Sequence, residues 1–116
     1  MHEVSIIHSA LEIILEKAKE NNMNKITRIT VKVGEMSGAL PDALSFAFEC
    51  ASRGTIAENS QFVIDRVKPT ARCEICNIVF DIDHFNKLCP KCSTFSSRIL
   101  TGYELYINTI EGDSNE

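Results

Sequence analysis

The sequence predicts an α/β fold in which two helices lie on a small three-stranded mixed sheet, with a metal-binding module inserted before the last strand. Two observations carry this prediction. Apolar residues repeat at helical and then at strand spacing, in the order helix, strand, helix, strand, and a further strand comes near the end. Two Cys-x-x-Cys pairs separate the last two strands, so the inserted module is expected to resemble a zinc ribbon.

Residues 4 to about 20 are expected to form the first helix. Its apolar stripe has helical spacing and consists of Val4, Ile7, Leu11, Leu15 and Ala18, with Ile14 beside it. Acidic and basic residues gather on another side of this helix. The asparagine-rich run from 21 to 24 then favours a turn.

The second helix is expected to begin at Pro41, because proline suits the first turn of a helix. Its apolar positions, again at helical spacing, are Leu44, Ala47, Phe48 and Ala51. Gly54 can end the helix. Cys50 lies within it, has no Cys-x-x-Cys partner and is expected to be a small buried residue.

Three strands are expected, at residues 26–33, 61–67 and 103–110. The apolar residues on one face of each are, in turn, Ile29, Val31 and Val33; Phe62 and Ile64; and Leu105 and Ile107. The first two strands enclose the second helix, which predicts a right-handed parallel crossover. The polar, acidic residues 111–116 are expected to form a frayed tail.

The inserted module contains Cys73, Cys76, Cys89 and Cys92. Four thiolates from two such pairs can close a tetrahedral site around one ion, with zinc expected before iron. The alternatives are two disulfides, which need an oxidising compartment, and a redox dithiol, which needs only one pair. A segment this short cannot bury a core of its own, so the ion is expected to stabilise it. Nearby basic side chains, which could offset the charge of a zinc–tetrathiolate centre, are Arg72, Lys87 and Lys91.

Composition and charge argue against several classes of protein. The chain has 116 residues, of which 44% are hydrophobic and 24% charged, as in an ordinary globular domain. No apolar run is long enough to span a bilayer, and early acidic residues argue against a signal peptide, so a cytoplasmic protein is expected. The net charge of −4, with scattered basic residues, argues against binding to nucleic acid.

The chain begins Met1-His2-Glu3, and these residues could chelate a second metal. The Met1 α-amine, the His2 amide nitrogen and the His2 imidazole can occupy three positions of one square plane through a five-membered and a six-membered ring. Deprotonating an amide requires a metal with a strong square-planar preference, namely nickel(II) or copper(II). The same atoms occur in any protein that starts Met-His, so a solvated terminus is the alternative.

Longer stretches carry a resemblance to a known family. After Met1-His2-Glu3 and the first helix come Val33-Gly34-Glu35-Met36-Ser37-Gly38, Phe46-Ala47-Phe48-Glu49, Gly54-Thr55-Ile56-Ala57-Glu58 and the paired cysteines. Together they resemble the HypA/HybF hydrogenase nickel-incorporation family over nearly the whole chain. The resemblance implies a cytoplasmic nickel metallochaperone, not an enzyme, that works with the maturation GTPase HypB and delivers nickel to the hydrogenase large-subunit precursor. Some members also serve urease, with urease accessory proteins as partners.

The resemblance also implies a role for individual residues. Nickel(II), the cargo, falls on Met1, His2 and the Glu3 backbone, and structural zinc(II) on the four paired cysteines. The implied domains are a nickel-binding α/β domain, 1–70 plus 99–116, and a zinc-binding module, 71–98. Ser93 departs from the family, in which glycine often follows the last cysteine.

Two further histidines could supply the missing nickel ligand. His84 lies between the cysteine pairs, where it could join the nickel plane or remain an exposed loop residue. His8 lies at the edge of the first helix's apolar stripe and is expected to be a helix-boundary residue. Asp81 and Asp83 are hard oxygen donors and suit a square-planar nitrogen site poorly.

Two other functional classes stay open at this point. A zinc-ribbon interaction module without nickel transfer would explain the cysteines and leave the N-terminus unexplained. An enzyme is disfavoured because the sequence has no nucleophile–base pairing, no phosphate loop and no zinc site with an open position. The expected protein binds neither membrane nor nucleic acid and is a monomer or a weak homodimer.

Overall fold

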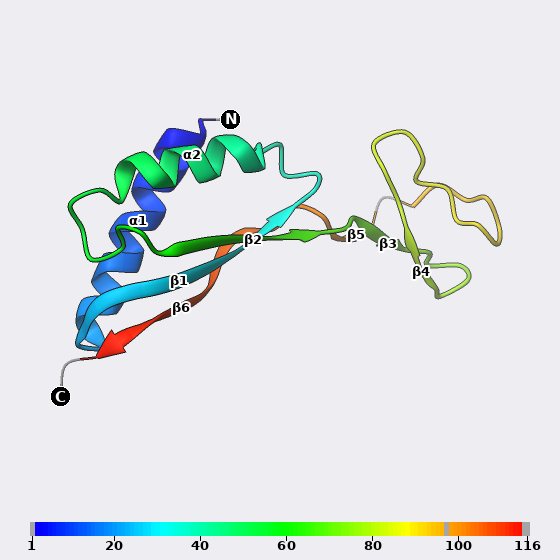
Figure 1. Ribbon diagram of the computed structural model, residues 1–116. Helices are drawn as coiled ribbons and strands as arrows, with labels where there is room; N and C mark the ends of the chain where they lie inside the picture. The colour runs from blue at the N-terminus through cyan, green and yellow to red at the C-terminus, as the bar shows by residue number, and fades with distance from the viewer. Residues whose placement is uncertain (1, 97, 115–116) are drawn as a thin grey trace. The chain divides into compact units, whose positions relative to one another are not determined.

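The computed structural model describes residues 2–96 and 98–114 and divides the chain into two compact units (Figure 1). The α/β unit comprises Met1–Lys32, Ala39–Asp65 and Tyr106–Glu116, and the ribbon unit comprises Val33–Gly38 and Arg66–Leu105. The elements are α1 (Glu3–Glu20), β1 (Met23–Gly34), α2 (Pro41–Ala51), β2 (Gln61–Val67), β3 (Thr70–Arg72), β4 (Val79–Asp81), β5 (Ile99–Thr101) and β6 (Leu105–Ser114).

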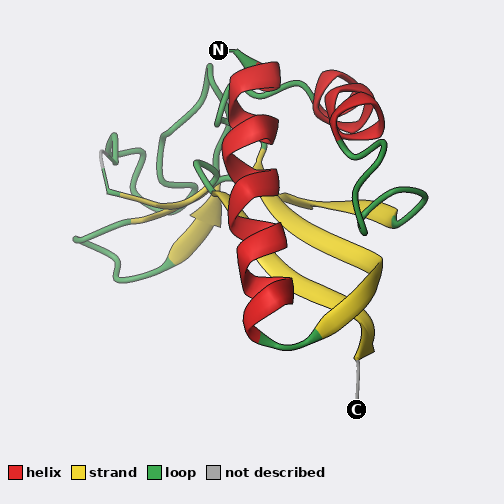
Figure 2. Cartoon of the chain, turned by 90° about the vertical axis from the view of Figure 1, so that its left-hand side faces the viewer, coloured by secondary structure: helices red, strands yellow, loops and turns green. Residues whose placement is uncertain are grey.

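The two helices pack against each other and cover one face of the larger sheet (Figure 2). The buried side chains of α1 are Ile7, Leu11, Ile14 and Ala18. This stripe differs from the expected one at two positions, because Val4 is exposed in the first turn and Leu15 is only half-buried. Helix α2 buries Leu44, Ala47 and Phe48, as its spacing predicted.

Helix α2 ends before the predicted glycine. Its last residue is Ala51, and Gly54, at φ +79°, belongs to the turn that follows. The Glu58 carboxylate accepts a hydrogen bond from the Gly54 N–H at 2.8 Å and closes this turn. Cys50 is exposed, so the prediction of a buried residue was wrong: the helix turns it away from the stripe that packs on the sheet.

The larger sheet has the order β2-β1-β6. Strands β1 and β2 are parallel. The Ile26 N–H near the start of β1 donates to the Ile56 carbonyl just before β2, and Lys32 near the end of β1 pairs with Asp65 of β2 at 2.5 Å. The strand–helix–strand prediction is therefore confirmed, with α2 in the connection.

Strand β6 lies antiparallel on the other side of β1. Thr27 Oγ1 donates to the Glu111 carbonyl at 3.2 Å, and the Gly34 N–H donates to the Glu104 carbonyl at 2.7 Å. The sheet is thus mixed, as predicted. Strand β6 continues to Ser114, so the prediction of a frayed tail was wrong for the described part of that segment.

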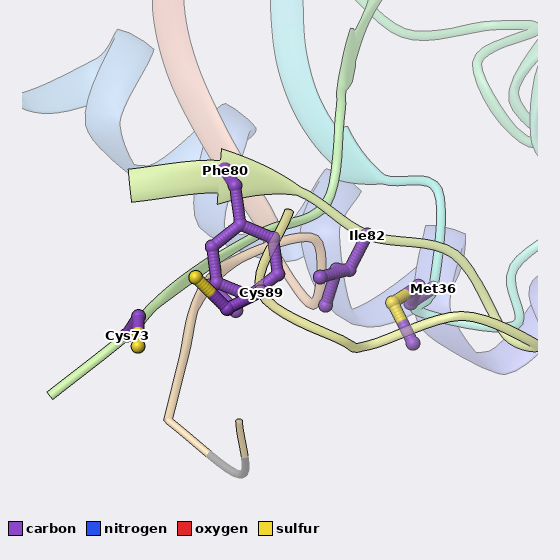
Figure 3. Close-up of a cluster of buried hydrophobic side chains, with 6 residues drawn as sticks. Met36, Cys73, Phe80, Ile82 and Cys89 are labelled. Atoms are coloured by element: carbon purple, nitrogen blue, oxygen red, sulfur yellow. The ribbon is translucent and has the colours of Figure 1, made fainter. Parts of the chain in front are cut away.

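The ribbon unit has a sheet of its own, in the order β4-β3-β5. Both pairs are antiparallel, and Ala71 in β3 lies opposite Phe80 in β4. Each strand has only three residues, too few for a periodic signal in the sequence. Their buried cluster consists of Met36, Ala71, Cys73, Phe80, Ile82 and Cys89 (Figure 3).

Met36 reaches this cluster because Val33–Gly38 belongs to the ribbon unit. The Met36 N–H donates to the Gly102 carbonyl at 2.8 Å. The backbones approach so closely that a Cβ added at Gly34 would lie 2.1 Å from the Gly102 carbonyl oxygen. A glycine is therefore required at position 34 for steric reasons.

No helix in the described part of the chain is long and apolar enough to cross a membrane.

Candidate metal centre

The four paired cysteines come together in the ribbon unit, with sulfur atoms that all lie within 4.8 Å of one another. Cys73 and Cys89 are buried, Cys76 is half-buried and Cys92 is exposed. The Cys73 and Cys92 sulfurs are 3.6 Å apart. In a tetrahedral site with zinc–sulfur bonds of about 2.3 Å, neighbouring sulfurs would be about 3.8 Å apart, so the spacing fits such an ion.

Each cysteine pair forms the same backbone knuckle. The Asn77 N–H donates to the Cys73 carbonyl and the Ser93 N–H to the Cys89 carbonyl, both at 2.8 Å. Asn77 and Ser93 have left-handed φ values of 60° and 61°. Asparagine tolerates this conformation, whereas serine adopts it at a cost. The Cys76 N–H also points at the Cys73 sulfur, at 3.4 Å.

The second hydrogen bond of each knuckle fixes its first cysteine. The Cys73 N–H donates to the Ile78 carbonyl at 2.9 Å, and the Cys89 N–H donates to the Thr94 carbonyl at 3.0 Å. These backbone hydrogen bonds fold each cysteine pair back on itself. The backbone alone brings each pair of sulfurs to one side, and the small sheet places the first knuckle at the ends of β3 and β4.

The protonation of the cluster indicates why it suits a cation. The pKa of Cys76 is raised to about 12, first by its hydrogen bond with Cys92 and then by burial and by the other two sulfurs. The pKa of Cys92 is lowered to about 6, chiefly by hydrogen bonds from Thr94. Thiols this close cannot all ionise next to one another, whereas a divalent ion would bind all four as thiolates.

Charged side chains near the centre have specific partners. The Arg72 guanidinium donates to Asn77 Oδ1 and so braces the first knuckle. Lys87 Nζ donates to the His84 carbonyl at 3.4 Å. Arg98 donates to Glu74 at 3.0 Å, a pair without a sequence signal because the two residues are 24 positions apart and both exposed.

His84 lies in a well-formed turn between the pairs and is exposed. Asp83 Oδ1 accepts the Phe85 and Asn86 N–H groups at 2.7 and 2.6 Å. These two bonds, the Phe85 one first, hold the pKa of Asp83 below its ordinary value. Asp83 is therefore occupied by the turn, which agrees with leaving it out of the metal ligands.

The second predicted site begins at Met1, which lies outside the described residues. His2 is the N-cap of α1: its carbonyl accepts the Ile6 N–H at 3.1 Å, while its side chain makes no capping bond. Glu3 follows as the first helical residue, and its Oε2 accepts the Leu40 N–H at 3.0 Å. That bond is the main reason why the pKa of Glu3 is lowered. His8, one helical turn further on, is exposed.

The chain is similar over nearly its whole length to proteins of a known family. The family described as hydrogenase/urease nickel incorporation, metallochaperone, HypA matches residues 1–112. The hydrogenase maturation factor HypA of a Picosynechococcus species is 39% identical over 111 residues, 96% of this chain and 98% of its own. The factor of the same name from Chlorobaculum parvum is 37% identical over 110 residues, 95% of this chain and 97% of its own.

A solved structure extends the likeness to three dimensions. The solution structure of the Ni metallochaperone HypA from Helicobacter pylori aligns with a TM-score of 0.69 at 26% identity. The alignment covers 99% of this chain and 100% of that one.

Proposed function

This chain belongs to the HypA family of hydrogenase nickel-incorporation metallochaperones, and from that membership we propose that it carries nickel(II) at its N-terminus. A HypA protein is a maturation factor and not an enzyme, and its role implies contact with other maturation proteins. The proposed ligands are the Met1 α-amine, the His2 amide and imidazole nitrogens, and the Glu3 backbone nitrogen. The supporting observation is that His2 is exposed and its side chain is not used to cap the helix.

The Glu3 nitrogen is the further donor of the proposed plane. It would lie next to the His2 amide nitrogen, so the imidazole would then take the position opposite that amide instead of closing the six-membered ring with it. As the first residue of α1, Glu3 has an N–H group with no backbone acceptor inside the helix, although its own carboxylate interacts with it. The His2 carbonyl, in contrast, already accepts the Ile6 N–H. A plane built from nitrogens therefore costs α1 none of its own hydrogen bonds.

The four-cysteine centre would hold structural zinc. The donor set of four thiolates and the 3.6 Å sulfur spacing support this assignment. When bound, zinc would supply a covalent-like cross-link between the two knuckles, and four protein ligands leave no position for transfer chemistry. We propose a nickel-binding domain of residues 1–70 plus 99–116 and a zinc-binding module of residues 71–98. The compact ribbon unit is larger than that module, because it also includes Val33–Gly38 and residues 66–70 and 99–105.

Capture and release follow from the chemistry of the nitrogens. Nickel(II) displaces protons from the amine, the amides and the imidazole, so affinity falls as the pH falls. Release follows when these atoms are protonated or when a partner supplies better ligands. An exposed site near a chain end gives such a partner access.

The proposed partners are a HypB-type maturation GTPase and the hydrogenase large-subunit precursor, in the cytoplasm. The description of the family, which names both hydrogenase and urease, supports hydrogenase as one recipient and urease as a second. His84 is kept as an additional nickel ligand. An unchanged nickel affinity and spectrum in His84→Ala, alone and with the GTPase, would remove it.

Nickel titration of the intact zinc-loaded protein tests the function. We expect one nickel per chain with a nitrogen/oxygen shell in X-ray absorption, and a sulfur shell around zinc. His2→Ala should weaken nickel binding by about 100-fold or more, while His8→Ala, an exposed histidine on the same helix, should not change it. Equal binding by the wild type and His2→Ala, or no binding by either, would leave a zinc-ribbon interaction module as the better description.

A further inference from the structure

The start of α1 is tied to the start of α2 by one side chain. Glu3 Oε2 accepts the backbone N–H of Leu40 at 3.0 Å, across 37 positions of sequence. Both residues belong to the α/β unit, in which the two helices pack against each other. The contact therefore joins the proposed nickel ligands to a packed part of the fold.

The Leu40 N–H is a donor that α2 cannot use. Leu40 is the N-cap of α2, with extended backbone angles, and its carbonyl accepts the Leu44 N–H at 3.0 Å. Its own N–H has no backbone acceptor within the helix and requires one from elsewhere. The Glu3 carboxylate supplies one, and its negative charge lies at the N-terminus of α1 and of α2, where both helix dipoles favour it.

A chain end without such a contact would fray. The first residues of a domain are mobile unless something holds them, and α1 begins only one residue after His2. The expected square plane needs nitrogens of consecutive residues held in one geometry. Holding the Glu3 side chain restricts the motion of the first turn of α1, from which the chain leaves toward His2.

We infer that the Glu3 carboxylate is a positioning residue for nickel: it anchors the chelating N-terminus to the Leu40 N–H and is not itself a ligand. The inference rests on the proposed nickel site. Anchoring reduces the ordering cost of binding, which is the usual source of affinity in a preorganised site. A carboxylate oxygen is also a poor donor for a square-planar nitrogen site, and one of the two Glu3 oxygens is already engaged by the Leu40 N–H.

The first test needs no nickel. Amide hydrogen exchange at Leu40 is measured by NMR in the nickel-free, zinc-loaded protein. Glu3→Ala should speed exchange at Leu40 by about tenfold, whereas Glu3→Gln, which keeps an oxygen acceptor, should stay within about threefold of the wild type. Glu12→Ala, an exposed acid on the same helix, is the matched control and should change nothing at Leu40. Equal exchange in the wild type and Glu3→Ala would overturn the anchor.

The second test separates anchor from ligand by nickel affinity. Glu3→Ala should weaken binding by about tenfold and Glu3→Gln by less than about threefold. Leu40→Pro removes the N–H donor, and the Leu40 side chain is exposed, so its nickel affinity should match that of Glu3→Ala. The double variant should bind nickel no more weakly than either single variant. If Leu40→Pro does not fold, the Glu3 pair still decides the question.

Two results would overturn the inference in this second test. One is that Glu3→Gln loses as much affinity as Glu3→Ala while Leu40→Pro binds normally, which would make Glu3 a ligand. The other is that Glu3→Ala binds like the wild type although His2→Ala does not. Failure of the nickel site itself gives a different result: His2→Ala binds nickel as well as the wild type, whatever the exchange at Leu40 shows.

Discussion

In the ribbon unit four sulfurs gather within 4.8 Å, and two of the four cysteines are buried. Each pair is held by backbone hydrogen bonds of its own knuckle. In the α/β unit His2 is exposed at the head of α1, and the carboxylate of the adjoining Glu3 accepts a hydrogen bond from the Leu40 N–H. Under the proposed function, this difference would separate retention from transfer: a metal bound by the four cysteines would be enclosed by the fold, and a metal bound at His2 would be exposed and able to leave.

The largest effect is expected when a buried sulfur of the four-cysteine cluster is removed. Cys89→Ser takes one ligand from the closed centre and leaves a buried polar group beside Phe80 and Ile82. We expect zinc affinity to fall by at least about 1,000-fold and the ribbon unit to lose its structure, because metal binding in small modules is on the order of 10–16 kcal/mol of folding energy. Zinc analysis after chelator challenge and NMR of the two core residues measure this.

Cys50→Ser is the control for that change. Cys50 is an exposed cysteine in α2, outside the cluster, and its loss should leave zinc content and spectrum unaltered. Retained zinc in Cys89→Ser would show that three thiolates suffice and that the centre is not closed.

The next largest effect concerns the segment that belongs to the ribbon unit but precedes α2. Gly34→Ala forces a Cβ to within 2.1 Å of the Gly102 carbonyl oxygen, so one backbone must move. We expect a loss of about 1–3 kcal/mol in the free energy of unfolding, the usual cost of overpacking, measured by denaturant titration. Gly38→Ala meets no atom within 4 Å and strains only its φ of +84°, so its loss should be smaller. The reverse order would mean that the close approach is not rigid.

The pH dependence of the Leu40 amide tests whether the Glu3 carboxylate accepts this hydrogen bond in its charged form. The pKa of Glu3 lies below its ordinary value of 4.5 in the folded protein, so the stability that its bond provides is present above that value and is lost as the pH falls through the lowered pKa. The Leu40 amide shift, followed by NMR in the nickel-free protein, should therefore titrate with a midpoint below 4.5. In Glu3→Gln the same shift should show no such transition, and a midpoint at or above 4.5 in the wild type would speak against a charged acceptor.

The smallest expected effect lies in the second knuckle. Ser93 has a φ of 61°, and glycine would adopt this angle without strain. Ser93→Gly should raise the stability of the zinc-loaded protein by about 1 kcal/mol in thermal unfolding. Asn77→Gly, at the matching position of the first knuckle, should gain less, because asparagine tolerates the angle and Asn77 also accepts a bond from Arg72. No gain in Ser93→Gly would indicate that the serine conformation is not strained.

The elements that could be predicted from the sequence are those with a local and repeated signal. The spacing of Ile7, Leu11 and Ala18 predicted α1, and the two Cys-x-x-Cys pairs predicted one metal-binding cluster. The sequence was insufficient where pairing depends on residues far apart. The three-residue strands of the ribbon unit are too short to have a period, and they exist because the chain around the cluster pairs with itself.

Two other features had no local signal. Strand β6 continues through polar residues because backbone contact decides it: a Cβ at Gly112 would lie 2.1 Å from the Lys25 carbonyl oxygen. The hydrogen bond that the Leu40 N–H donates to Glu3 uses a main-chain donor, so the residue type at position 40 does not predict it. Such contacts require coordinates, because the sequence records side chains and not which backbone groups remain to be satisfied.

The placement of Val33–Gly38 in the ribbon unit bears on how such a protein can evolve. The chain passes between the two units four times, after Lys32, Gly38, Asp65 and Leu105. Excising the ribbon as one block would leave Met36, a member of its buried cluster, behind in the remainder. A lineage could therefore exchange, lose or acquire this ribbon only by changing two separate stretches of its gene together, which ties the histories of the two units to each other.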